Sequence, residues 1–337
     1  MNPNDKTPPG LIDLAAERVG GRALLANDEF FAEKENLLQP GRGIFIPDKY
    51  TDHGKWMDGW ETRRRRIPGH DWCVVQLGLR GIIKQVDIDT NHFLGNHPPF
   101  ASLDALCLTT EFPPDTAAID GLSWTPILAR SPLNPGAQNL FPISHGEPAT
   151  HVRLNIIPDG GVARLRVYGI VVPDWSALKP NDVIDLVAVE NGGVPLACSD
   201  MFFSSMNNLI MPGRSANMGD GWETKRRRGP GHDWIILKLG LPGTIEKIEV
   251  DTNHFKGNYP DTCSIEACVA PDASTDELTN SPWKEILPRT KLEANKRHFF
   301  ERELSPLSAC THLRLNIYPD GGVSRFRVWG KPTLPNE

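Results

Sequence analysis

The sequence predicts an all-β protein made of two tandem jelly-roll β-sandwich domains that arose by internal duplication. Three observations support this fold class. Blocks of residues occur twice along the 337-residue chain. Gly and Pro number 30 each, a density that disfavours long helices and favours short strands joined by turns. Hydrophobic residues make up 39% of the chain, which is enough to build a buried core.

The duplication is visible as matched blocks in the two halves. Asp58–Thr62 returns as Asp220–Thr224, and Asp89–Phe93 returns as Asp251–Phe255. Further pairs are Phe30-Phe31 with Phe202-Phe203, Pro68–Trp72 with Pro230–Trp234, and Pro158–Val162 with Pro319–Val323. A repeat of this length is a whole domain and not a solenoid unit. The predicted parts are a polar tail at 1–11, a first repeat at 12–172, a linker at 173–182, a second repeat at 183–331 and a tail at 332–337.

The two repeats differ by an insertion. The spacing between matched residues falls from 172 (Phe30 to Phe202) to 162 (Asp58 to Asp220), so the first repeat carries ten extra residues between Arg42 and Asp58. Equivalent blocks allow two sites per chain, one composite site, or one active and one decayed site, and the sequence does not choose among them.

Within each repeat, alternation and turn residues indicate the strands in order. In the first repeat, 71–77 and 82–89 are strand-like runs separated by Gly78 and Gly81. Residues 151–156 alternate between apolar and polar side chains, and Pro158–Gly161 predicts a tight turn into a partner strand at 163–169. Other strands are expected at 100–108 and, more weakly, near 44, 124–128 and 139–143, with short helical pieces at 13–19 and 28–38.

Composition excludes several classes of protein. Lys+Arg is 36 and Asp+Glu is 42, giving a net charge of −6, which argues against a nucleic-acid binder. No apolar run is long enough to span a membrane, and the polar N-terminus has no export signal. Six cysteines without CxxC spacing indicate reduced thiols. Because 334–337 is not a peroxisomal signal, the expected compartment is the cytoplasm.

Taken together, the repeated blocks resemble the allantoicase family. The resemblance rests on Asp58–Arg64, Gly69–Trp72, Asp89–Phe93 with Gly95-Asn96, and Arg153–Ile156 with Pro158–Gly161, and it covers the chain from Ile12 to Lys331 with the second copies included. It implies two galactose-binding-like jelly rolls in tandem and hydrolysis of allantoate to (S)-ureidoglycolate and urea, in allantoin and purine breakdown. It also implies a homo-oligomer and, as in some members, dependence on a divalent metal such as manganese.

The implied chemistry defines the residues that a site needs. Allantoate is a small anion with one carboxylate and two ureido groups on one carbon. Urea leaves that carbon readily only if a proton reaches it, so a general acid and a base are needed. An Arg fork matches the carboxylate, and amide-like groups match the ureido groups.

The sequence offers this inventory in both repeats. Candidates for acid/base chemistry are His92, His254, Glu61, Glu223, Asp89 and Asp251. Candidates for substrate binding are Asn91, Asn253, Arg64, Arg226, Arg153 and Arg314. Metal ligands cannot be assigned from the sequence.

Each group has a structural alternative. The Asp-Thr-Asn segment is rich in side chains that bond their own backbone, so it is also typical of a turn. The basic run that contains Arg64 is also typical of a solvated loop, and Arg153 could form a cross-strand ion pair. Alternative functions are a non-catalytic tandem carbohydrate-binding protein and a relative that cleaves ureidoglycolate.

Overall fold

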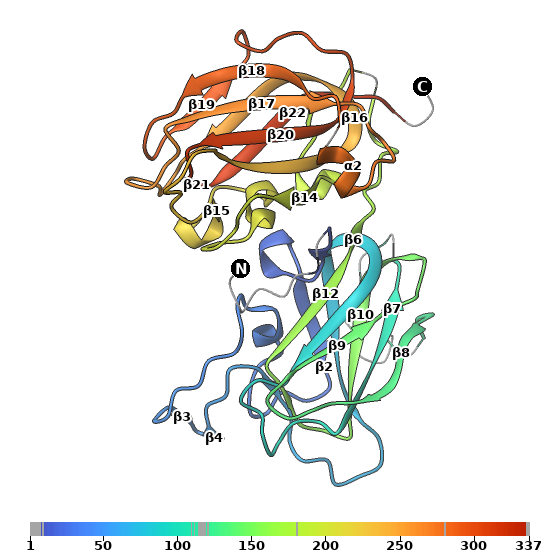
Figure 1. The fold of residues 1–337 in the computed structure, drawn as a ribbon. Coiled ribbons are helices and arrows are strands. Elements are labelled where there is room, and N and C mark those ends of the chain that lie inside the picture. Colours follow the sequence, from blue (N-terminus) through green and yellow to red (C-terminus); the bar gives the residue numbers. More distant parts are fainter. Residues whose placement is uncertain are drawn as a thin grey trace. The chain divides into compact units, whose positions relative to one another are not determined.

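The computed structural model describes residues 8, 10–108, 110, 112–113, 119, 121–179, 181–279 and 281–334. They form two compact units, Leu11–Val172 and a second unit that begins at Pro173 (Figure 1). Both units consist almost entirely of strands with the same order along the chain, which confirms the predicted all-β duplication. The predicted tails at 1–11 and 332–337 lie mostly outside the described residues, and the exact domain boundaries stay predictions.

Each unit is built on one antiparallel sheet of eight strands, in which the order of the strands differs from their order along the chain. In the first unit the order is β1-β12-β6-β10-β7-β8, and β2 and β9 also pair with β6. The strands of this sheet are β1 (Ile12–Asp13), β2 (Arg22–Ala26), β6 (Asp71–Asp89), β7 (Phe100–Leu106), β8 (Thr125–Pro132), β9 (Gln138–Pro142), β10 (Pro148–Ile157) and β12 (Arg164–Val171). A separate pair joins β5 (Trp60–Glu61) to β11 (Gly161–Val162).

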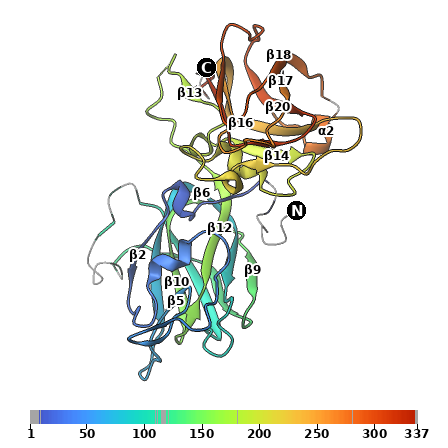
Figure 2. The same ribbon diagram turned by 90° about the vertical axis from the view of Figure 1, so that its left-hand side faces the viewer.

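The second unit repeats this topology, with the order β13-β22-β16-β20-β17-β18 and with β14 and β19 also on β16 (Figure 2). Its strands are β13 (Ile184–Asp185), β14 (Val194–Cys198), β16 (Asp233–Asp251), β17 (Thr262–Cys268), β18 (Lys284–Lys291), β19 (Arg297–Phe300), β20 (Cys310–Tyr318) and β22 (Arg325–Pro332). The pair equivalent to β5 and β11 is β15 (Trp222–Glu223) with β21 (Gly322–Val323).

The long strand β6 connects the two faces of the first sandwich. Its first half pairs with β10 and β2, and its second half pairs with β12 and β9. The two runs predicted at 71–77 and 82–89 are therefore one strand, and the glycines between them lie inside it. A Cβ at Gly78 would lie 2.3 Å from the carbonyl oxygen of Val19, so only glycine permits this close approach.

The predicted hairpin between 151–156 and 163–169 is wrong. β10 pairs with β6 and β7, whereas β12 pairs with β6 and β1, so the turn at Pro158–Gly161 carries the chain between faces of the sandwich. A local turn signal gives the position of the reversal. It does not give the neighbour of the next strand, which β6 determines by pairing with both.

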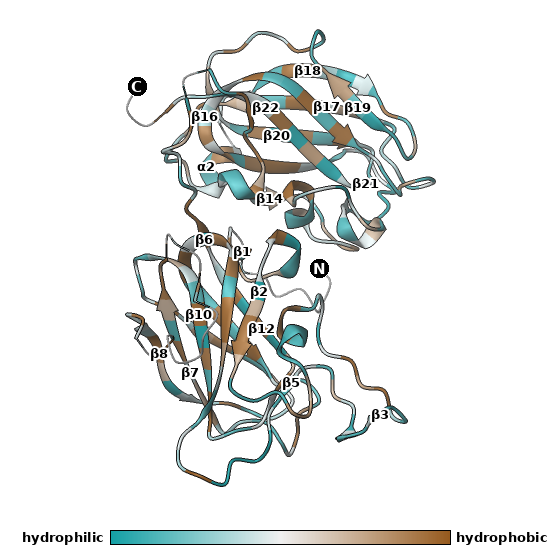
Figure 3. Ribbon diagram, turned by 180° about the vertical axis from the view of Figure 1, so that it is seen from behind, coloured by the Kyte–Doolittle hydropathy of each residue, from teal (hydrophilic) through white to brown (hydrophobic). Residues whose placement is uncertain are grey.

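The core follows from the alternation seen in the sequence. Val152, Leu154 and Ile156 on β10 are fully buried, as are Leu165 and Val167 on β12. Figure 3 shows the hydrophobic residues, in brown, along the strands of both units. Burying one such side chain stabilises the fold by about 1.5–3 kcal/mol, so the alternation fixes which face of each strand is inside.

Some weaker predictions are corrected. The segment near Ile44 is not a strand, and the helical pieces expected at 13–19 and 28–38 are 3-10 turns at η1 (Glu17–Val19) and η2 (Lys34–Leu38). The ten extra residues of the first repeat lie in a long loop, residues 43–57, which we call the arm. It carries the short hairpin of β3 (Tyr50–Thr51) and β4 (Gly54–Lys55) and extends away from the sheet (Figure 1).

The remaining elements of the second unit are short. They are η3 (Val189–Asn191), η4 (Met206–Ile210), η5 (Met218–Asp220) and α2 (Thr275–Thr279). No helix within the described ranges is both long enough and apolar enough to cross a membrane. All six cysteines are free thiols.

Candidate functional site

The two ends of β6 meet at one end of the first sandwich. The amide of Asp71 donates to the carbonyl of Pro158 over 3.1 Å, and the amide of Ala163 donates to the carbonyl of Asp89 over 2.8 Å. The connection from β10 to β12 therefore holds both ends of β6 together. We call the segments 58–62, 89–97 and 158–164 the loop end of the first repeat. The matched segments 220–224, 251–259 and 319–325 form the loop end of the second.

A buried phenylalanine organises this loop end. Phe93 has no exposed surface, and its ring lies against the backbone of Gly59 and Gly161. A Cβ at Gly161 would lie 2.0 Å from the ring, and one at Gly59 would lie 2.8 Å from it. The repeated Asp-Gly-Trp and Asp-Gly-Gly blocks thus contain glycine because the ring takes the space of a side chain. Phe255 has the same relation to Gly221 and Gly322 in the second repeat.

Asp89 is occupied by an ion pair. Its carboxylate accepts two hydrogen bonds of 2.8 Å from Arg42 Nε and Nη2, and a third of 2.9 Å from the backbone N–H of Asn91. Asp89 is only 1% exposed, and the Asn91 amide donates to the carbonyl of Gly43 over 2.7 Å. Asp89 and Asn91 therefore anchor the base of the arm, and this geometry gives them a positioning role.

The equivalent group of the second repeat is looser. Arg214 lies 3.5 Å from Asp251, and its side chain is 59% exposed. Asn253 donates to Ser215 over 3.4–3.5 Å. The same residue types thus form a tight group beside the arm and a loose one in the repeat that has no arm.

His92 and His254 occupy the same unusual turn. Both have a left-handed backbone, with φ of 68° and 69°, which bends the chain directly after Asn91 and Asn253. His92 is exposed, and its ring centroid lies 5.6 Å from that of Phe45 in the arm. His254 Nε2 lies 2.9 Å from the carbonyl oxygen of Ser215. The structure therefore brings each His to the Asp and Asn candidates of its own repeat.

Glu61 is a partly buried carboxyl held by one amide. It sits on β5, opposite Gly161, and its Oε1 accepts a 2.7 Å hydrogen bond from the side-chain amide of Asn96. Burial raises the pKa of Glu61 above its ordinary value, and the neutral amide offsets this only in part. Glu223 repeats the arrangement, with a hydrogen bond from Asn258 and a pKa also raised by burial.

A pair of phenylalanines adjoins the backbone of each of these glutamates. Phe31 donates its backbone N–H to the carbonyl of Glu61 over 3.2 Å, and Phe30 packs edge-to-face on Phe31 with centroids 5.1 Å apart. Phe30 is 41% exposed. In the second repeat the pair is Phe202 and Phe203, 50% and 55% exposed, and Phe203 donates to Glu223 in the same way. The sequence marked these phenylalanines only as repeated residues.

The four arginine candidates lie in two different places. Arg64 and Arg226 are exposed just after Glu61 and Glu223, and within the described residues their guanidinium groups form no hydrogen bond or ion pair. Arg153 and Arg314 instead lie on the sheet face, where they pair with Asp104 over 3.0 Å and with Glu266 over 2.6 Å. Arg153 is five residues before Pro158, about 16 Å along the strand from the loop end. The structure does not bring Arg153 and Glu61 together.

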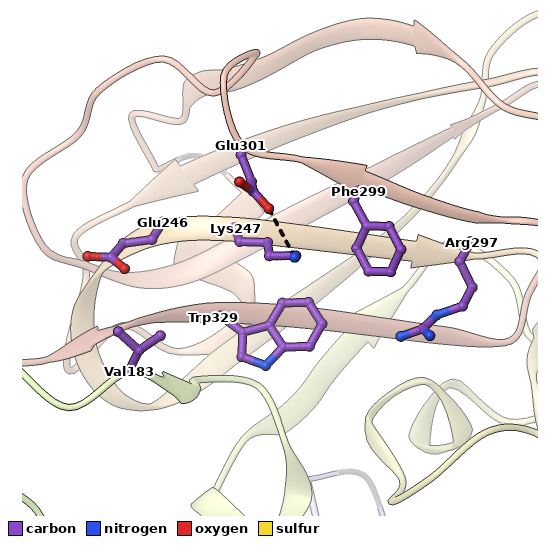
Figure 4. A pocket seen from close by; sticks show the side chains of 7 residues that line it. All are labelled: Val183, Glu246, Lys247, Arg297, Phe299, Glu301 and Trp329. Carbon is purple, nitrogen blue, oxygen red and sulfur yellow. Dashed lines mark ion pairs between the residues drawn. The ribbon is translucent and has the colours of Figure 1, made fainter.

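A hollow of about 520 Å³ lies on the face of β16, β19 and β22 in the second unit (Figure 4). Lys247 lies in it, 4.8 Å from the Phe299 ring and 2.9 Å from Glu301. The other lining residues are Val183, Glu246, Arg297 and Trp329. None of them is a predicted site residue, and the position of Lys247 in the first repeat is taken by Gln85. The residue at the centre of this hollow is therefore not shared by the two repeats.

The residues that the structure describes do not assemble a metal site within one chain. Across the ranges that the structure describes, no three His, Cys, Asp or Glu side chains converge as ligands of an ion would. The nearest acidic candidate, Asp89, is already neutralised by Arg42. We therefore derive no step through manganese.

The fold and the loop ends define a duplicated jelly-roll protein in which each repeat holds a carboxyl of raised pKa on a strand that an aromatic pair adjoins. The allantoicase repeat model matches residues 12–172 and 184–333. A probable allantoicase of Pseudomonas aeruginosa is 52% identical over 96% of this chain and 97% of its own length, and probable allantoicase 1 of Burkholderia mallei is 50% identical over 95% and 94%. The crystal structure of allantoicase from Saccharomyces cerevisiae superposes with a TM-score of 0.80 at 38% identity, over 95% of this chain and 93% of that one. The chain belongs to the allantoicase family.

Proposed function

We propose that this member of the allantoicase family hydrolyses allantoate to ureidoglycolate and urea at the loop ends of its repeats. The observation that carries the choice of site is the partly buried carboxyl of Glu61, which accepts a hydrogen bond from one amide and lies on a strand whose backbone an aromatic pair adjoins, and which Glu223 repeats. Buried carboxyls with raised pKa values are typical of general acids.

Glu61 acts in this proposal as the acid for the leaving group. Asn96 occupies Oε1, so the proton of the neutral carboxyl resides on Oε2. That proton passes to the ureido nitrogen that departs, the C–N bond breaks, and urea leaves. The lone pair of the retained ureido nitrogen stabilises the central carbon until water adds to it. The water oxygen stays on the carbon as the hydroxyl of ureidoglycolate, and one of its protons restores the acid.

The groups next to Glu61 bind the substrate and exclude water from it. The exposed guanidinium of Arg64, three residues after Glu61, offers two parallel N–H donors to the substrate carboxylate. Phe30 and Phe31 form an apolar wall that removes water from one side and so strengthens the polar contacts on the other. Asp89 and Asn91 position the turn that carries His92, and His92 exchanges protons with solvent. Glu223, Arg226, Asp251, Asn253 and His254 take the same roles in the second repeat.

The test removes the acid without changing its shape. Glu61→Gln and Glu223→Gln, singly and together, are assayed for urea release from allantoate, with circular dichroism to verify folding and Glu147→Gln, an exposed residue, as the matched control. We expect the double variant to lose about 10²–10⁴-fold in kcat/KM, as is typical for loss of a positioned acid. Normal turnover in the folded double variant would move the chemistry away from the loop ends. Ureidoglycolate as a second substrate separates this activity from that of a ureidoglycolate-cleaving relative.

We also propose that the enzyme serves allantoin and purine breakdown, works in the cytoplasm and forms a homo-oligomer. The six free thiols support a reducing compartment. The arm supports an interface with another copy, because Ile44, Phe45 and Tyr50 on it are 57%, 46% and 68% exposed. Sedimentation analysis of the whole chain measures the state of assembly.

A further inference from the structure

The arm contacts two parts of the first loop end: the turn at His92 and the aromatic pair that begins with Phe30. On one side the ring of Phe45 lies 5.6 Å from that of His92, beside the pair of Arg42 and Asp89. On the other side His53 stacks on Phe30, with centroids 4.1 Å apart and planes inclined by only 12°. Residues 43–57 thus bring to the first site an imidazole that the second repeat lacks, because the ten extra residues occur once.

The hydrogen bond of His53 fixes which of its nitrogens can act as a base. Nδ1 lies 2.6 Å from the carbonyl oxygen of Phe30. A carbonyl can only accept, so Nδ1 carries the hydrogen and donates it. In the neutral ring the lone pair is then on Nε2. In the part of the chain that the structure describes, no hydrogen bond engages Nε2.

Two contacts link His53 to the backbone of the strand that carries the proposed acid. Its stacking partner Phe30 is followed by Phe31, whose N–H bonds to the carbonyl of Glu61. The imidazole therefore packs on the phenylalanine that precedes the residue bonded to the Glu61 backbone. Its position is set twice, by the stacked ring and by the hydrogen bond to the backbone, so Nε2 has a defined direction.

We propose that His53 is the catalytic base of the first site and that turnover is concentrated in the first repeat. This inference rests on the proposed function of Glu61. Glu61 gives its proton to the departing ureido nitrogen, and urea leaves as the C–N bond breaks, while the lone pair of the retained ureido nitrogen stabilises the central carbon. Nε2 of His53 then takes a proton from water as the water oxygen bonds to that carbon. The imidazolium then returns a proton to the Glu61 carboxylate, so both groups are restored and one water is consumed.

The second repeat has the acid without this base. Glu223 and the pair of Phe202 and Phe203 match their counterparts, and the arm with its imidazole is missing. The second loop end is thus equipped to bind the ureide anion, and its slower turnover distinguishes it from the first.

The experiment compares His53→Ala and His53→Phe in the full chain. The Phe variant keeps a ring to stack on Phe30 and removes Nε2, so it separates chemistry from packing. We expect a loss of about 10²–10⁴-fold in kcat for both variants, partial recovery of His53→Ala by added imidazole, and unchanged kinetics for the control His145→Ala. Full activity in His53→Phe, or a loss in His53→Ala that imidazole does not relieve, overturns the proposal.

The glutamate variants show whether a negative result concerns only His53 or the whole proposed site. If Glu61→Gln is inactive while both His53 variants are active, only the role of His53 fails. If Glu61→Gln and the double glutamine variant are also active, the proposed site fails with it. Glu223→Gln should retain most of the parental kcat, and an equal loss in Glu61→Gln and Glu223→Gln would overturn the division of labour between repeats.

Discussion

Removing Arg42 should destabilise the first repeat far more than removing Arg214 destabilises the second. Asp89 is 1% exposed and accepts two 2.8 Å bonds from Arg42, so Arg42→Ala leaves a buried carboxylate with only the backbone N–H of Asn91. Breaking a buried pair typically costs 3–5 kcal/mol. The Arg42 side chain is 31% exposed, so we expect about 3 kcal/mol.

Arg214→Ala is the matched control. Its single 3.5 Å contact with Asp251 involves a side chain that is 59% exposed, and such pairs contribute about 0–1 kcal/mol. Removal of Arg214 should therefore leave stability nearly unchanged.

The assay is urea denaturation combined with hydrogen exchange. Arg42→Ala should lower the unfolding midpoint and increase exchange in 86–96, whereas Arg214→Ala should leave 248–258 protected. Equal effects of the two substitutions, or a loss below 1 kcal/mol in Arg42→Ala, would refute the reading of Asp89 as a buried anchor. A decrease in turnover of Arg42→Ala beyond its unfolded fraction would show that the anchor also positions the first site.

Two further predictions follow from the same packing and burial. Burial raises the pKa of Asp87 to about 6, so between pH 4 and 6 the folded state holds a proton that the unfolded chain has lost. The free energy of unfolding therefore falls by up to about 3 kcal/mol as the pH rises through that range. Asp87→Asn should remove this slope and be more stable than the parent at pH 7.5 but not at pH 4, and a pH-stability curve parallel to that of the parent would contradict the assignment. Gly161→Ala should destabilise by about 1–3 kcal/mol because its Cβ meets the Phe93 ring, whereas Gly95→Ala, which meets no atom within 4 Å, should not, as thermal unfolding of both variants can check.

The sequence predicts the strands because the core forces a local pattern on them. Alternation at Val152, Leu154 and Ile156 reports directly which side chains are inside. The pairing of strands cannot be predicted in this way. The turn at Pro158–Gly161 has the same sequence whether the next strand pairs with the preceding one or crosses to another face of the sandwich. Only the length of β6, which pairs with both β10 and β12, decides this. That information is non-local and is absent from any short window of sequence.

The candidate site was predictable in its residue types and not in its partnerships. Glu61 and Asp89 carry the same charge in matched blocks, and the sequence does not distinguish the carboxyl that an amide holds from the one that Arg42 neutralises. The contacts that separate them span 35 and 47 residues along the chain. The sequence shows His53 as part of an insertion found in the first repeat alone, and it was not a site candidate because the candidates were chosen among matched residues.

Repeated residues in this chain therefore indicate shared packing more directly than shared chemistry. Phe93 and Gly161 recur as Phe255 and Gly322 because the loop end of each sandwich is packed around the same buried ring, independently of its chemistry. A difference between the repeats carries more information about function, since the shared scaffold cannot account for it. The arm is such a difference: its base tightens the Asp89 group, and His53 near its tip stacks on the aromatic wall beside Glu61. If one repeat does most of the chemistry, the insertion is the physical reason, and the second repeat shows what the same scaffold holds without it.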